Sequence, residues 1–225
     1  MTTIVIDIDD TLISTGRRMQ AIWRQILGCE VPLEAVEAQD LEQTFLQFAT
    51  SEQKTHAKEF QKRFWDIVLC LDEVGVDLIK LHEPIPLAAE VLQVWNRQFT
   101  LVYLTGRIEN TRRLTLDELR NFGFPTDNTQ LLMFNVKDYA RMRNENPSGP
   151  TLVDAKARLL STLPKNCTVV RVVDDYPSYF PIYKQFGIPE RIGLLRAKRY
   201  SPRQYIDEGA TRVIDSWKQL QNDLL

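Results

Sequence analysis

Short runs of β-branched and apolar residues, separated by helix-like segments, constrain the fold of this chain more than any other feature. The runs are Thr3–Ile8, Phe99–Leu104, Gln130–Phe134, Thr168–Val173 and Arg191–Leu195. Helical patterns lie between the last four, which is typical of a parallel sheet covered by helices. Unbroken apolar runs such as VVRVV suit strands that are buried on both faces. The sequence therefore predicts a three-layer α/β fold. Its helices are expected at Leu87–Asn96, Asn110–Phe122 and Ser216–Leu224.

The segment between the first run and residue 84 has a different pattern. It has no β-like run, and an apolar stripe at helical spacing extends from Met19 to Leu27, with Gly28 as the expected end of that helix. A second helix is expected near Leu41–Phe48. A third begins at Thr50 with a capping box and continues to Leu71. We therefore predict a helical cap domain at 15–83, inserted into a core domain made of 1–14 and 84–225.

Composition excludes some classes of function. The chain has 225 residues, a formal net charge of -2 and a pI near 5.8, so it lacks the overall basic character of a nucleic-acid-binding protein. No apolar stretch approaches the ~18 residues of a membrane span, and no signal sequence is recognisable at the N-terminus. We expect a cytoplasmic protein. One local exception is the basic stretch RAKRYSPR at 196–203, which is either a solvated loop or a binding site for the phosphate backbone of a nucleic acid.

Carboxylates follow the first predicted strand. Asp7 and Asp9 lie at its end and point to the same side, since side chains alternate along a strand, whereas Asp10 need not join them. Two close carboxylates favour either a shared proton or a divalent cation. A calcium loop is disfavoured because Leu12 and Arg18 stand where such a loop needs Gly and Glu. A purely structural turn stays open.

Two other predicted strands end in polar residues. Thr105-Gly106-Arg107 follows Leu101–Leu104 and offers a hydroxyl, accessible backbone amides and a guanidinium, a combination suited to phosphate; a simple strand-to-helix turn is the alternative. Asp174 and Asp175 follow Val169–Val173 and could be a helix cap with a solvated charge. Because the carboxyl ends of parallel strands form one edge of a sheet, the three groups together predict a ligand site there.

The combination of DIDDT, LTGR, a lysine and VVDD resembles the haloacid dehalogenase superfamily of aspartate-dependent phosphohydrolases, over roughly 1–14 and 84–200. The resemblance implies a Rossmann-like core with a mobile cap. It also implies that Asp7 attacks phosphorus, that Asp9 protonates the leaving oxygen and then activates water, and that a lysine neutralises charge. The phosphoryl group would be held by Thr105, Gly106, Arg107 and the lysine. Mg²⁺ would be held by Asp7, the backbone carbonyl of Asp9, Asp174 and Asp175.

Two of these assignments have alternatives. Lys156, which opens a helix ahead of the fourth strand, is preferred for the lysine over Lys137, which follows the third strand. Either Asp174 or Asp175 is the direct metal ligand, with the other orienting it or the lysine.

The aspartate at position 9 favours, within this superfamily, a phosphatase or a phosphomutase, and a cap favours a small phosphorylated metabolite as substrate. Cap-side candidates for substrate binding, or simple surface charges, are Arg17, Arg18, Arg24 and Lys54. The alternatives are a phosphatase for nucleotide or nucleic-acid end phosphates, a phosphomutase and a non-catalytic binding protein. The sequence does not identify the oligomeric state.

Overall fold

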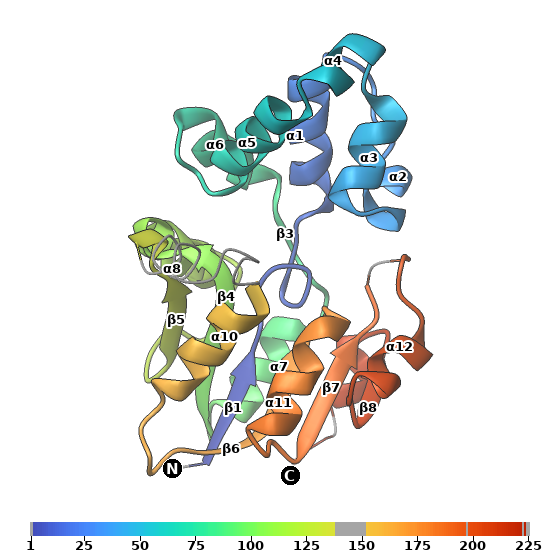
Figure 1. Cartoon of the computed structure of the whole chain (residues 1–225). Helices are drawn as coiled ribbons and strands as arrows, with labels where there is room; N and C mark the ends of the chain where they lie inside the picture. Colours follow the sequence, from blue (N-terminus) through green and yellow to red (C-terminus); the bar gives the residue numbers. More distant parts are fainter. Residues whose placement is uncertain (1, 138–151, 197, 222, 224–225) are drawn as a thin grey trace. The chain divides into compact units, whose positions relative to one another are not determined.

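The computed structural model describes residues 2–137, 152–196, 198–221 and 223 (Figure 1). The chain forms two compact units. The larger one comprises Met1–Leu12, Pro84–Arg196 and Tyr200–Leu225, and the smaller one comprises Ile13–Glu83 and Ala197–Arg199. Within the described ranges, no helix combines the length and the apolar character that are needed to cross a bilayer.

The larger unit is built on a six-stranded parallel sheet with the strand order β5-β4-β1-β6-β7-β8 and with helices on both faces (Figure 1). The strands are β1 (Thr2–Ile6), β4 (Thr100–Ile108), β5 (Gln130–Phe134), β6 (Thr168–Asp174), β7 (Glu190–Leu194) and β8 (Arg212–Ile214). The predicted α/β class and its five strands are confirmed. The edge strand β8 was not predicted, because three residues are too few to show a strand pattern.

The helices of this unit pack their apolar faces on the sheet. They are α7 (Ala88–Trp95), η2 (Glu109–Thr111), α8 (Arg112–Asn121), α10 (Leu152–Ser161), η3 (Pro177–Tyr179), α11 (Phe180–Gln185), α12 (Pro202–Asp207) and η4 (Trp217–Leu220). The helix predicted at Ser216–Leu224 is reduced to η4 among the described residues, and Leu224 lies outside them. Trp217 anchors this turn: its ring packs near that of Trp95 and its Nε1 donates to the Thr11 carbonyl at 2.8 Å.

The first strand lies in the middle of the sheet. Ile4, Val5 and Ile6 are fully buried, as expected of a strand covered on both faces. The chain proceeds from β1 outward through β4 and β5, then returns to the other side of β1 as β6. Strand order therefore reverses next to β1, and open α/β sheets bind their ligands at the carboxyl ends of strands at such a point.

Strand β4 is longer than predicted. The sequence placed its end at Leu104 and a turn at Thr105-Gly106-Arg107, but the strand continues to Ile108. Its pairing with β5 shifts register between Leu104 and Ile108, where Ile108 meets Phe134. The polar triplet thus lies in an irregular part of a strand, which fixes its backbone more firmly than a free turn would.

The smaller unit is helical. Its elements are α1 (Gly16–Leu27), α2 (Leu33–Ala38), α3 (Leu41–Phe48), α4 (Ser51–Thr55), α5 (Ala57–Val68), α6 (Glu73–Asp77) and η1 (Leu78–Leu81). The short strands β2 (Ile13–Ser14) and β3 (Glu83–Pro84) pair with each other at its two ends. Gly28 ends α1 in the left-handed conformation, as predicted.

The apolar faces of these helices form a separate core, in which the rings of Trp23 and Phe64 lie 4.4 Å apart. The capping box at Thr50 and Gln53 is present, but the helix predicted from it breaks at His56. Its second part, α5, ends at Val68, so the predicted apolar position Leu71 lies beyond the helix and is exposed.

Arg18 is a buried structural residue of the smaller unit. Its Nη2 donates to the carbonyl oxygens of Ile67, Val68 and Gly75 at 3.0, 2.9 and 3.3 Å. Since charge-assisted hydrogen bonds are stronger than neutral ones, the guanidinium ties α1 to the turn after α5. The expectation that Arg18 is a surface charge or a substrate contact does not match this burial, because a guanidinium with 5% of the residue exposed is committed to the interior.

Candidate functional site

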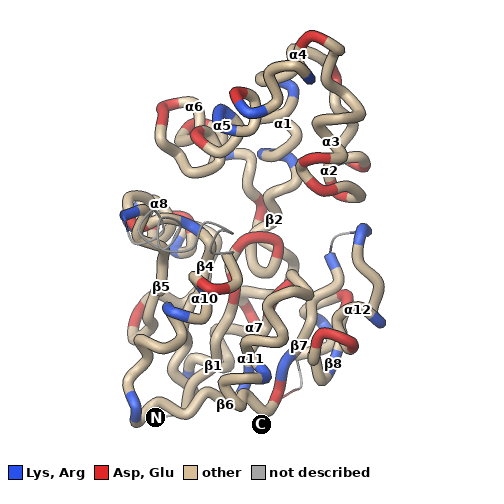
Figure 2. Tube along the Cα trace, viewed as in Figure 1, with Lys and Arg blue, Asp and Glu red and all other residues tan. Residues whose placement is uncertain are grey.

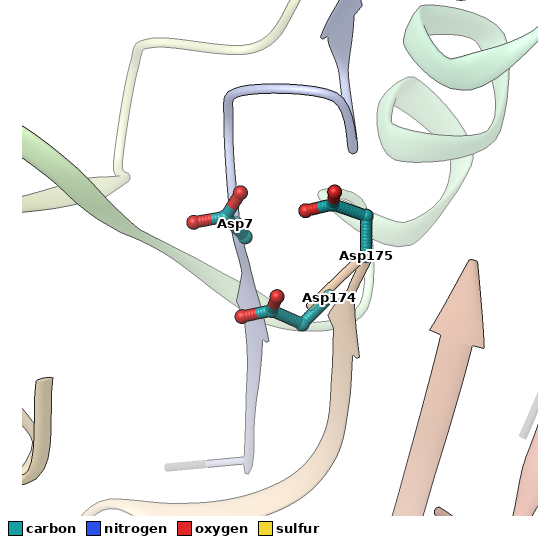
Figure 3. A group of neighbouring side chains, drawn as sticks. All are labelled: Asp7, Asp174 and Asp175. Carbon is teal, nitrogen blue, oxygen red and sulfur yellow. The ribbon is translucent and has the colours of Figure 1, made fainter. Parts of the chain in front are cut away.

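Acidic side chains meet where β1 and β6 end (Figure 3). Carboxylate oxygens of Asp7, Asp174 and Asp175 all lie within 4.8 Å of one another. The backbone N–H of Asp7 donates to the carbonyl of Val173 at 3.0 Å, which holds the end of β1 against the end of β6. Asp7 is 6% and Asp174 0% exposed, so water screens their mutual repulsion poorly.

Lys156 of α10 supplies the compensating charge. Its Nζ lies 2.7 Å from Asp7 Oδ1 and 2.8 Å from Asp174 Oδ2, and 3.9 Å from the centre of the Tyr179 ring. The residue is 1% exposed. The other candidate lysine, Lys137, is exposed, and its described hydrogen bond is from its backbone N–H to Asn135. The lysine that the sequence analysis preferred is thus the one beside the carboxylates.

Burial and crowding alter the acidity of the site. Burial raises the pKa of Asp7 to about 8, against the lowering effect of Lys156 and with a further rise from Asp174. Burial also raises the pKa of Asp175 well above its usual range, helped by Asp10 and Asp174. Desolvation disfavours the ammonium of Lys156, but Asp174 and Asp7 outweigh this effect and its pKa lies well above the ordinary value. The lysine is therefore a permanent cation.

The two acidic residues at the end of β6 have different surroundings. Asp174 Oδ2 accepts from both Lys156 and the Tyr183 hydroxyl, the latter at 2.5 Å, and its Oδ1 accepts from the backbone N–H of Tyr176 at 2.9 Å. Asp175 Oδ1 accepts from Thr11 Oγ1 at 3.3 Å. Asp174 is thus engaged in orienting Lys156, and Asp175 has the freer carboxylate.

A tyrosine holds the backbone of this segment. The Tyr205 hydroxyl donates to the carbonyl oxygens of Asp175 and Leu194. Gly193 in β7 makes this possible, because a Cβ at that position would lie 2.4 Å from Tyr205 Cδ1. Neither Tyr183 nor Tyr205 was predicted, since tyrosines in apolar stretches are ordinary core residues and carry no local signal of a site.

The polar triplet of β4 lies beside Asp9. Thr105 is fully buried and its Oγ1 lies 3.5 Å from Asp9 Oδ2. The Arg107 guanidinium pairs with both oxygens of Asp9, with Nη2 to Oδ1 at 2.7 Å and Nε to Oδ2 at 3.0 Å. At Gly106 an added Cβ would meet Phe134 at an ordinary 3.8 Å, so the protein's own packing does not demand glycine there. All the predicted core site residues therefore lie at the carboxyl ends of β1, β4 and β6 or contact residues there.

The donor set suits a hard divalent cation. Its carboxylate oxygens lie close together, with neither sulfur nor imidazole among them, and oxygen ligands are what Mg²⁺ and Ca²⁺ prefer. Because burial raises the pKa of Asp7 and of Asp175, a cation held there would have to stabilise their ionised forms, and its binding would release protons.

Two of the remaining basic candidates, Arg17 and Arg24, have acidic partners of their own. Arg17 pairs with Glu83 and Arg24 with Glu30, at 2.9 and 2.6 Å, and Lys54 is exposed. In the stretch 196–203, which Figure 2 shows as basic segments between β7 and α12, Lys198 lies 3.5 Å from Glu37 and Arg199 donates to the Gln39 carbonyl. Residue 197 of this stretch lies outside the described residues.

Comparison with known proteins gives the fold independent support. No family model and no curated protein matches the sequence. The structure is similar to a haloacid dehalogenase-like family protein from Streptococcus pneumoniae, with a TM-score of 0.63 and 13% identity over 98% of this chain and 96% of that one. It is similar to a hydrolase from Pseudomonas syringae, with a TM-score of 0.58 and 17% identity over 99% and 97%.

A third similar structure is a HAD family hydrolase from Deinococcus radiodurans, whose crystal contains bound phosphate and sodium. Its TM-score is 0.56, with 16% identity over 97% of this chain and 92% of that one. At identities this low, the structural similarity establishes the fold alone. The matches extend over both units. This chain therefore has the fold of haloacid dehalogenase-like proteins, as the resemblance of its motifs implied.

Proposed function

We propose that this protein is a Mg²⁺-dependent phosphomonoester hydrolase that acts through a phosphoaspartate on Asp7. The observation that carries the proposal is Lys156, a buried ammonium held between Asp7 and Asp174 next to a third carboxylate. A purely structural ion pair would not need three carboxylates around one lysine at the strand-order reversal of the sheet.

In the first step, a carboxylate oxygen of Asp7 attacks phosphorus. The bond between phosphorus and the leaving oxygen breaks, its electron pair goes to that oxygen, and Asp9 supplies the proton that converts it into an alcohol. Lys156 reduces the repulsion between the Asp7 carboxylate and the phosphate dianion. The Thr105 hydroxyl and the backbone amides around Gly106 are the proposed holders of the transferring phosphoryl group, and Gly106 leaves room for it.

In the second step, Asp9 takes a proton from water while the water oxygen attacks phosphorus. The bond to Asp7 breaks and its electron pair restores the carboxylate, and phosphate leaves. Covalent catalysis of this kind divides a very slow hydrolysis into two easier reactions. Asp9 ends with the proton that it gave up in the first step, so the cycle is balanced.

The cation would be held by Asp7, Asp175 and the backbone carbonyl of Asp9, with Asp174 orienting Lys156. The freer carboxylate of Asp175 supports this division, since both oxygens of Asp174 already accept hydrogen bonds. When bound, Mg²⁺ supplies charge that offsets the repulsion between Asp7 and the substrate phosphate.

The proposed substrate is a small phosphorylated metabolite, and the proposed location is the cytoplasm. The slight negative charge of the chain supports a small substrate over a nucleic acid. The basic stretch near Lys198 and Arg199 gives little support to nucleic-acid binding, because both side chains already have partners.

The test is Mg²⁺-dependent release of phosphate from an aryl phosphate, followed by a panel of phosphorylated metabolites. Asp7→Asn should abolish release, whereas Asp117→Asn, which alters an exposed carboxylate of α8, should leave it unchanged. Trapping the phosphoenzyme by acid quench and locating it on Asp7 by mass spectrometry would establish the covalent step.

Other outcomes separate the alternatives. Full activity in Asp7→Asn would contradict the mechanism. Transfer of phosphate to a sugar phosphate in place of water would indicate a phosphomutase, and a preference for oligonucleotide ends would indicate a nucleic-acid phosphatase. No release from any phosphomonoester would favour a binding protein.

A further inference from the structure

Arg107 joins two acidic side chains from different elements. Its Nε and Nη2 face Asp9, at 3.0 to 3.1 Å and 2.7 Å, while its Nη1 donates to Glu118 Oε2 at 2.5 Å and to Thr115 Oγ1 at 3.3 Å. The side chains of Arg107 and Glu118 are 11% and 6% exposed. This series of contacts links Asp9, in the loop after β1, to the helix α8.

The position of Arg107 is fixed from the side away from Asp9. Thr115 and Glu118 are three residues apart on α8, so they lie on one face of the helix and accept from the same guanidinium nitrogen. Glu118 is buried, so its ion pair with Arg107 is poorly screened by water and holds the guanidinium against α8. A planar guanidinium held in this way presents its Nε–Nη2 edge in one direction, toward Asp9.

We propose that Arg107 and Glu118 are positioning residues for Asp9: Glu118 fixes the guanidinium, and the guanidinium fixes the carboxyl group of Asp9 for proton transfer. The inference rests on the proposed function, in which Asp9 is the acid and base. It gives Arg107 a role different from phosphate binding, because the edge that would bind a phosphate faces Asp9.

A positioning role has a kinetic signature. The value of kcat/KM covers the reaction up to departure of the alcohol, so it depends on the acid step and not on hydrolysis of the phosphoenzyme. An alkyl alcohol is a poor leaving group and needs the proton from Asp9, whereas a nitrophenolate leaves readily without it. Misplacing Asp9 should therefore lower kcat/KM for an alkyl phosphate far more than for an aryl phosphate.

The experiment measures kcat/KM for glycerol phosphate and p-nitrophenyl phosphate in wild type, Glu118→Gln and Arg107→Lys. Both variants keep the size of the side chain; the first removes the buried negative charge and the second removes the two-pronged contact. We expect a loss of about tenfold on the alkyl substrate and less than about threefold on the aryl one, a part of the roughly hundred- to ten-thousand-fold that acid catalysis contributes. Glu109→Gln is the matched control, since it breaks a half-exposed pair with Arg112 beside the same helix.

A double-mutant cycle separates positioning from a merely structural effect. In an Asp9→Asn background the pair has no acid to position, so Glu118→Gln should no longer change the alkyl-to-aryl ratio. Equal losses on both substrates, or a ratio that still changes in the Asp9→Asn background, would overturn the inference and return Arg107 to phosphate binding or to a structural role.

Should Glu118→Gln fail to fold, Arg107→Lys alone decides by the same ratio. If wild type releases no phosphate from these two substrates or from any phosphomonoester of the panel, the proposed function itself fails. An active wild type, an inactive Asp7→Asn and an unchanged ratio would refute the positioning pair alone.

Discussion

Removing the charge of Lys156 is the most direct test of how the site is held together. In Lys156→Met the side chain keeps its approximate length, but Asp7 and Asp174 lose a cation at 2.7 and 2.8 Å in an environment with 1% exposure. Removing one partner of a buried ion pair typically costs about 3–5 kcal/mol. We expect a loss of this size in the free energy of unfolding at pH 8 without metal. Since total stabilities are about 5–15 kcal/mol, a loss of this size leaves the variant folded except at the lower end of that range.

The same variant should respond to pH and to cations in a defined way. Burial already raises the pKa of Asp7 to about 8 in wild type, and loss of the lysine raises it further, so Asp7 is protonated at pH 5 in both proteins. The cost of the substitution should therefore grow as the pH rises through about 8, where Asp7 ionises in wild type and stays protonated in the variant. Mg²⁺ should stabilise Lys156→Met more than wild type, since the ammonium no longer repels the incoming cation. Urea unfolding followed by circular dichroism, with EDTA or Mg²⁺, measures both effects.

The control is Lys62→Met, which removes a lysine that is 77% exposed and paired with Asp66 on α5, and should change stability by less than about 0.5 kcal/mol. A loss below about 1 kcal/mol in Lys156→Met would place its contacts in the range of surface pairs and refute the reasoning. If Mg²⁺ stabilised wild type and variant equally, the expected repulsion between the Lys156 ammonium and the cation would be refuted.

Three further expectations concern the metal, a glycine and the smaller unit. Because the folded pKa of Asp7 is raised to about 8, its contribution to metal-free stability is largest at acid pH and falls as the pH rises from about 4 to 8. The gain in melting temperature on adding Mg²⁺ should thus be larger at pH 8 than at pH 5, and equal gains would contradict this. Gly193→Ala should lower the free energy of unfolding by about 1–3 kcal/mol, since the new Cβ would overlap Tyr205; an unchanged urea midpoint would refute the overlap. Arg18→Met should lose about 1.5–3 kcal/mol or more with its carbonyl contacts, and unaltered proteolysis of the smaller unit would speak against that.

The parts of the fold that follow local patterns were predictable. Continuous apolar runs identified the buried strands, and acidic or hydroxyl residues directly after them located Asp7, Thr105 and Asp174. Lys156 was preferred over Lys137 as the opening of a helix ahead of β6; α10 does precede β6, but it begins at Leu152 and Lys156 lies one turn inside it.

The partners of these residues could not be predicted in the same way. From the sequence, Glu118 is expected to be an ordinary charged residue on a helix surface. Its burial follows from the place where α8 packs. Arg18 is likewise expected from the sequence to be a surface residue of an amphipathic helix. The structure shows that the turn after α5 supplies carbonyl groups to it. Pairings across long sequence distances leave no local pattern, so sequence analysis identified the candidate site residues and missed those that hold them.

The central place of β1 has a consequence for the order of folding. Its neighbours begin at Thr100 and Thr168, so β1 pairs with strands that are synthesised well after it. The smaller unit has a core of its own within Ile13–Glu83 and needs mostly nearby contacts. Since local contacts form faster than distant ones, the helical insertion should be the first part to become compact. Strand β1 should complete its pairing only after β6 has been synthesised.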